Sequence, residues 1–106
     1  MLLSRVTEMG WAAFHIQKLR RGESVQFRPR GNSMSGRIES GQLCTVAPVK
    51  LEDIRVGDIV LCKVSGTDYL HIVKAVQGGR LLIGNNKGRI NGWTRNVYGR
   101  LVRVEP

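Results

Sequence analysis

Acidic residues are scarce in this sequence of 106 residues, in which 8 Asp and Glu stand against 17 Lys and Arg. The formal net charge is +9, and no acidic residue occurs between positions 69 and 104. Such an excess of positive charge attracts nucleic acids or acidic proteins. The alternative interpretation is a surface charge that only keeps the chain in solution. The basic residues that we expect to contact such a partner are Arg89, Arg95, Arg100 and Arg103.

Long apolar runs, cysteines and histidines are also scarce. No run approaches the roughly 18–20 apolar residues that a membrane-spanning helix requires. Polar and charged residues interrupt positions 1–14, so the apolar region of a secretory signal is missing and we expect a cytoplasmic protein. Cys44 and Cys62, like His15 and His71, are too far apart in sequence for a zinc motif or a disulfide framework. We therefore expect no metal and no cofactor.

The length and the hydrophobic content of 42% predict one compact domain with a buried core. We expect an amphipathic helix over 1–22, ended by Gly22, and a β domain over 23–106. The helix is predicted because apolar residues recur at steps of three and four. These residues are Leu2, Val6, Met9, Ala13 and Ile16. Trp11 and Phe14 flank this face, and they either dock the helix on the domain or bind a partner.

After residue 22 the apolar pattern changes to the alternation that is typical of β-strands. Glycine and asparagine turns separate the strands, and the 13 glycines suit many short strands joined by tight turns. The fold class that we predict is mainly β, largely antiparallel, with one N-terminal α-helix. The expected strands cover 25–27, 43–49, 59–64, 69–76, 80–83 and 96–104.

Ser33 is the first residue that could carry chemistry, because Gly31 and Met34 flank it in a segment that follows a strand. A serine hydroxyl needs a nearby base to become a nucleophile at neutral pH. His71 and Lys74 are the candidates, and because side chains alternate along a strand only one of them can face Ser33. The alternative interpretation is a turn serine and a structural histidine.

The segment 83–93 combines three asparagines, three glycines and two basic residues with a tryptophan. Such a loop can offer amide donors and cations to a phosphate, a carboxylate or a peptide backbone. The alternative is a turn-rich hairpin whose asparagines adopt left-handed conformations and cap their own backbone.

Five short motifs, taken in order, resemble the LexA/signal-peptidase superfamily over about residues 25–104. They are Gly31-x-Ser33-Met34, Ser40 to Val46, Val56 to Val60, His71 to Val73, and Ile83 to Asn86. The resemblance implies a coiled, all-β fold in which a serine acts with a lysine or histidine base.

Carried over residue by residue, the resemblance makes Ser33 the nucleophile and His71 the base. It also makes the backbone N–H of Ser33 an oxyanion donor, and it places Asn85 where the family has the aspartate that orients a histidine. The residues that then line the substrate or oxyanion site are Gly31, Asn32, Met34, Asn85 and Asn86.

We therefore predict a serine peptidase with a Ser33–His71 dyad that acts in trans on a protein substrate. Self-cleaving repressors of this superfamily cut an Ala-Gly or Cys-Gly bond, and neither dipeptide occurs in the chain. Two alternative hypotheses stay open. The first is a catalytically inactive module that binds a peptide or partner protein in the same groove, and the second is a basic nucleic-acid-binding protein.

Overall fold

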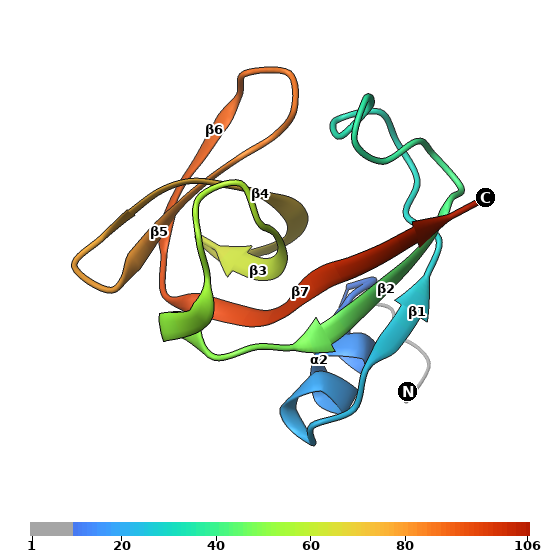
Figure 1. Ribbon diagram of the computed structural model, residues 1–106, viewed down its shortest axis with the longest axis horizontal. Coiled ribbons are helices and arrows are strands. Elements are labelled where there is room, and N and C mark those ends of the chain that lie inside the picture. The colour runs from blue at the N-terminus through green and yellow to red at the C-terminus, as the bar shows by residue number, and fades with distance from the viewer. Residues whose placement is uncertain (1–9) are drawn as a thin grey trace.

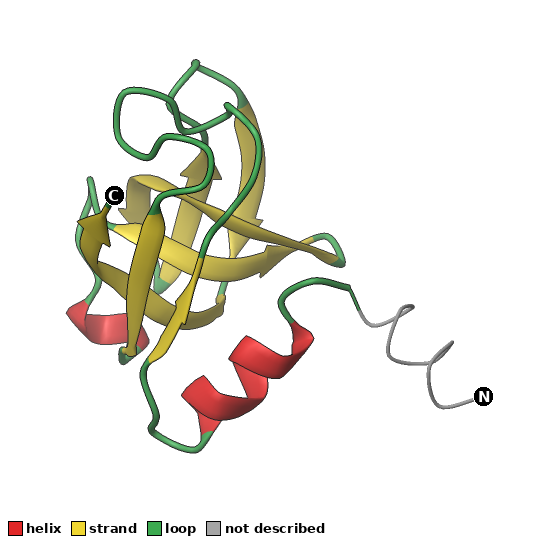
Figure 2. Ribbon diagram, turned by 90° about the vertical axis from the view of Figure 1, so that its right-hand side faces the viewer, coloured by secondary structure: helices red, strands yellow, loops and turns green. Residues whose placement is uncertain are grey.

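Seven antiparallel strands and one α-helix make up residues 10–106, the part of the chain that this computed structural model describes (Figures 1 and 2). The predicted class, mainly β with one helix, is confirmed. The strands lie in the order β1-β2-β7-β3-β4-β5-β6. Their bounds are β1 Val25–Phe27, β2 Leu43–Pro48, β3 Ile59–Val64, β4 Thr67–Gln77, β5 Arg80–Gly84, β6 Ile90–Thr94 and β7 Asn96–Glu105. A short 3₁₀ helix, Leu51–Asp53, follows β2.

The helix α2 covers Ala13–Arg20, which is shorter than the predicted 1–22. Residues 1–9 lie outside the described part, and residues 10–12 are not helical. Gly10 has a φ of +84°, a left-handed value that a right-handed helix does not contain. The C-terminal end of the helix is as expected, since the chain leaves the helix at Gly22. This residue also has a φ of +84°, and its N–H donates to the carbonyl of Leu19 over 3.0 Å.

All six expected strands are present, with ends shifted by at most two residues, and β6 is the strand that the sequence did not predict. Asn91 and Gly92 lie in β6, and both residue types are uncommon in strands. The segment 83–93 thus forms the hairpin rather than an open loop. Its asparagines are not left-handed, since Ser65 is the one non-glycine residue with positive φ in the described chain.

The sheet curls back on itself where β6 passes into β7. Arg95 alone separates these strands, yet β6 pairs with β5 whereas β7 pairs with β3. The hydroxyl of Thr94 donates to the carbonyl of Lys63 in β3 over 2.6 Å, which joins the two ends of the curl. Strands β3 to β7 form the rounded half of the ribbon in Figure 1, and a buried apolar cluster belongs to this half. Its buried residues include Val60, Cys62, Val73, Leu81 and Ile83.

A second apolar core lies between α2 and the sheet. Ile16 and Leu19 of α2 pack there with residues from β2, β3 and β4. Met34 and Leu70 belong to the same buried cluster, and each is the direct sequence neighbour of a candidate catalytic residue. The core thus anchors both segments that carry the candidate chemistry. Within residues 10–106, no helix has the length and apolar character needed to cross a bilayer.

Candidate active site

Ser33 and His71, 38 positions apart in sequence, meet across the space between the β1–β2 loop and β4. The Oγ of Ser33 lies 3.2 Å from Nε2 of His71, and Nδ1 of His71 lies 2.7 Å from Oδ1 of Asn91. An amide oxygen only accepts hydrogen bonds, so Nδ1 donates its proton to Asn91. Nε2 is then unprotonated and accepts the hydroxyl proton of Ser33. The three side chains form a hydrogen-bonded chain that leaves the imidazole ready to act as a base.

The environment of His71 keeps its imidazole neutral. The residue is 8% exposed, and its ring stacks on Tyr69 with the centroids 4.9 Å apart. Burial lowers the pKa of His71 below 6.5, and the hydrogen bond to Asn91 opposes this shift only in part. An imidazole that is neutral near pH 7 can accept a proton, which is the property a general base requires.

Lys74, the other candidate base, points elsewhere. Its side chain packs over Gly84, where an added Cβ would lie 2.9 Å from Cε of Lys74 and 2.7 Å from the carbonyl of Arg89. Lys74 is also the extra residue at a register shift between β4 and β5, which falls between Val73 and Ala75. Of the two candidate bases, His71 is therefore the one that lies beside Ser33.

Asn91 is a site residue that sequence reasoning missed, because a β-bulge directs its side chain. Ile83 pairs with Gly92 and Gly84 pairs with Ile90, so Asn91 is the extra residue between them. A bulge turns a side chain out of the regular alternation of its strand. The available signal was the glycine next to Asn91, since a glycine inside a strand often marks a bulge.

Asn85 and Asn86 hold the β5–β6 turn and the serine loop rather than the imidazole. The side-chain oxygen of Asn85 accepts the backbone N–H groups of Lys87 and Arg89 over 2.8 and 2.9 Å. Asn86 donates its backbone N–H to the carbonyl of Ser33 over 3.0 Å and its side-chain N–H to the carbonyl of Ser35 over 2.7 Å. The residue that orients His71 is therefore Asn91 rather than Asn85, and Asn86 fixes the backbone of the serine loop.

The serine loop is also held from within. The carbonyl of Met34 accepts the N–H groups of Arg37 and Ile38 over 2.9 and 2.8 Å, and both Met34 and Ile38 are buried. Among the described residues, no group accepts a hydrogen bond from the backbone N–H of Ser33.

A cleft of about 490 Å³ opens beside Ser33 and His71. Of the residues predicted to line the site, Gly31 and Met34 border this cleft, whereas Asn32, Asn85 and Asn86 do not. Its apolar wall consists of Phe27, Met34, Ile38 and Leu70. The cleft thus combines a nucleophile–base pair at one side with an apolar lining, the usual character of a ligand pocket.

Within residues 10–106, no strand pairs with the second edge of the first half of β4, which runs along this cleft. Residues 67–71 pair with β3 on one side, while pairing with β5 begins only at Ile72. Asp68, Tyr69, Leu70 and His71 all border the cleft. A free strand edge offers N–H and C=O groups with which an extended peptide can pair.

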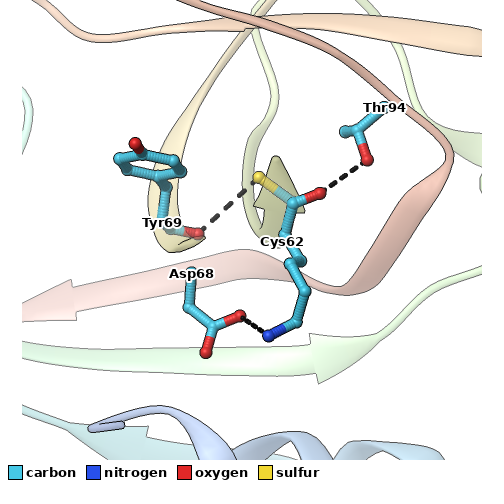
Figure 3. A network of polar contacts seen from close by, with 5 residues as sticks. Cys62, Asp68, Tyr69 and Thr94 are labelled. Carbon is cyan, nitrogen blue, oxygen red and sulfur yellow. Dashed lines mark hydrogen bonds and ion pairs between the residues drawn. The ribbon is translucent and has the colours of Figure 1, made fainter. Parts of the chain in front are cut away.

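A small polar network secures this half of β4 (Figure 3). The carboxylate of Asp68 lies 3.0 Å from Nζ of Lys63, and no other described residue donates a hydrogen bond to the same oxygen. The Sγ of Cys62 lies 3.7 Å from the carbonyl of Tyr69, and burial raises the pKa of Cys62 to about 12. This thiol is therefore not a nucleophile at neutral pH.

The four arginines predicted to meet an acidic partner are spread over the β5–β6 turn, the β6–β7 corner and β7. Three of them have intramolecular partners: Arg95 donates to the carbonyl of Gly78, Arg100 lies 3.6 Å from Asp58, and Arg103 lies 3.1 Å from Glu105. They do not form one group around the cleft.

The sequence matches no protein-family model, and no curated protein is significantly similar to it. The chemistry of this chain is therefore argued from the geometry of Ser33, His71 and Asn91.

Proposed function

We propose that this protein is a serine peptidase that cleaves an extended segment of another protein. Ser33 is the nucleophile, His71 is the general base and Asn91 orients the imidazole. The observation that carries this proposal is the hydrogen-bonded chain from Ser33 through His71 to Asn91 beside a cleft with a free strand edge. The motif order that resembles the LexA/signal-peptidase superfamily supports the same pair of residues.

The reaction follows from the positions of these atoms. A substrate strand pairs with β4, and Oγ of Ser33 attacks the carbonyl carbon while Nε2 of His71 takes the hydroxyl proton. His71 then gives this proton to the leaving amine, and the peptide bond breaks to leave an acyl group on Ser33. A water molecule attacks the acyl group as His71 takes its proton, and the proton returns to Ser33 as the acid product leaves.

The backbone N–H of Ser33 stabilises the negative charge that develops on the carbonyl oxygen. Donors that are already oriented contribute most, because they need no rearrangement during the reaction. Asn86 holds the neighbouring peptide unit, because its backbone N–H donates to the carbonyl of Ser33 over 3.0 Å.

A second candidate function is peptide binding without turnover, and Asn91 is the observation that favours it. A carboxylate at this position stabilises the imidazolium that forms when the base is protonated, whereas an amide does not. The corresponding change from Asp to Asn in a serine-protease triad slows kcat about 10⁴-fold. The same cleft and the same free edge of β4 serve either function.

Labelling with a fluorophosphonate, which reacts with activated serines, tests the peptidase directly. We expect the wild-type protein to be labelled, and Ser33→Ala and His71→Ala to lose the label. Ser35→Ala is the matched control, because this serine lies in the same loop and contributes its backbone carbonyl to Asn86. Equal labelling of the wild type and Ser33→Ala would overturn the proposal. Binding of peptides without labelling would favour the second function.

A further inference from the structure

Three aromatic side chains form one wall of the cleft. Phe27 lies between Trp11 and His15, with ring centroids 5.4 and 4.6 Å apart, respectively. All three residues border the cleft, although Trp11 is 50% exposed. Trp11 and His15 come from the segment that precedes β1. His15 lies in α2, the helix that Figure 2 shows beside the sheet. Two of the three rings therefore come from the segment before β1, and the third, Phe27, belongs to β1 itself.

The residue next to Trp11 lies near the beginning of β4. An added Cβ on Gly10, next to Trp11, would lie 4.0 Å from a carboxylate oxygen of Asp68. Asp68 precedes His71 by three residues on β4, and a strand rises about 3.3 Å per residue, so these two residues lie roughly 10 Å apart along the strand. A peptide paired with the edge of β4 therefore reaches the wall about three residues from the bond that is cleaved.

Four charged residues border the cleft, the acidic Glu39 and Asp68 and the basic Arg28 and Arg30. Arg28 donates to the carbonyl of Gly41 over 2.8 Å. The aromatic rings, rather than these charges, favour an apolar occupant. Asp68 is the acidic residue of β4 that borders the cleft, and Lys63 neutralises it at 3.0 Å. The other acidic group, Glu39, accepts the backbone N–H of Gly36. Aromatic rings attract large apolar side chains through area burial and through edge-to-face contacts.

Resting on the proposed function, we infer that the wall of Trp11, His15 and Phe27 is a specificity subsite. It accepts a large apolar or aromatic side chain of the extended substrate, about three residues from the scissile bond. The subsite selects unfolded or extended segments that carry such a residue, and the segment before β1 is what gives the enzyme this preference.

The test is the cleavage of a library of decapeptides, with every cleavage site read by mass spectrometry. The wild type should prefer Phe, Trp or Leu at one position about three residues from the cut, by about tenfold in kcat/KM over Ala at that position. Trp11→Ala should lose this preference and still cleave, whereas Trp11→Phe should keep most of it. The matched control is Phe14→Ala, since Phe14 is 54% exposed and does not border the cleft.

Two outcomes would overturn the subsite: selectivity that is unchanged in Trp11→Ala, or an equal loss in Phe14→Ala, which would indicate a general effect on the helix. If the peptidase proposal itself is wrong, neither the wild type nor any variant cleaves any peptide, and this result differs from a loss of selectivity. In that case, the fluorescence of Trp93→Phe, which retains Trp11 as its one tryptophan, is measured on adding the same peptides. A shift for Phe-containing peptides supports the subsite without the peptidase, and no shift overturns both.

Discussion

The two histidines of this chain border the same cleft but lie in different surroundings. His71 projects from a central strand, is 8% exposed and is hydrogen bonded through both ring nitrogens. His15 lies on α2, is only half-buried and stacks on Phe27. Burial lowers the pKa of both, and for His15 the charge of Lys18 adds to the effect.

Under the proposed function, the difference between the two histidines is one of hydrogen-bond partners rather than of protonation alone. A base needs a nucleophile on one nitrogen and an orienting acceptor on the other, because the orientation sets which nitrogen is free to take the proton. His71 has both partners. His15 contributes an aromatic face, which is what a specificity wall requires.

The largest expected effect separates the two histidines by activity. His71→Ala should reduce kcat for peptide cleavage by at least about 10³-fold, because the base is lost. His15→Phe should change it less than about fivefold, since a phenyl ring still stacks on Phe27. Single-turnover assays on one peptide with both variants measure this. Equal losses would show that the histidines act together and that the distinction drawn from their hydrogen bonds is wrong.

The next effect concerns the acceptor behind His71. Asn91→Asp should raise kcat at least about tenfold, because a carboxylate stabilises the imidazolium that forms during the reaction. It should also raise the pKa of His71, so that the pH profile of kcat/KM shifts to higher pH. The matched control is Asn96→Asp, an exposed position on β7, which adds the same charge. A gain in both variants would point to net charge rather than to orientation.

The third effect concerns stability. It tests whether weaker packing of α2, which carries His15, leaves Ser33 and His71 in place. Ile16→Ala should lower the free energy of unfolding by about 2–3 kcal/mol, since Ile16 is 7% exposed in the core under α2. Gln17→Ala, on the exposed side of the same helix, should change it by less than about 0.5 kcal/mol. Urea unfolding measures both. Fluorophosphonate labelling of folded Ile16→Ala should persist, because Ser33 and His71 are anchored by β4 and the serine loop.

The smallest effect is the pH dependence of stability. Both histidines have folded-state pKa values below the unfolded value near 6.5, so the unfolded chain binds protons first as the pH falls. The free energy of unfolding should therefore decrease from pH 7.5 to pH 5.5. His15→Phe and His71→Phe should each make this dependence shallower. A slope that neither variant alters would show that other groups govern it.

Much of the fold was predictable because it depends on local patterns. Alternating apolar residues and glycine turns indicated six of the seven strands, and Gly22 marked the end of the helix. The missed strand, β6, contains Asn91 and Gly92, whose propensities argue against a strand. Pairing with β5 overrides these propensities, since backbone hydrogen bonds and the buried Thr94 hold β6 in place.

The candidate site was predictable only in part, for the same reason. Ser33 and His71 stand out through the residue types around them, and strand alternation separates His71 from Lys74. Asn85 lies within the motif that resembles the superfamily, and the glycine beside Asn91 was only a weak sign of a bulge. The choice of Asn91 depends on that bulge in the β5–β6 pairing, which is a property of the register between the strands.

Residue types and their periodicity were therefore enough to predict a mainly β domain with one helix, because each strand and turn follows from its own neighbours. Which groups meet was decided by tertiary structure. The contact from Ser33 to His71 spans 38 positions, and the contact from His71 to Asn91 spans 20. Such contacts arise only when the packed cores set the register of the strands, since a shift of one residue would turn His71 away from the cleft.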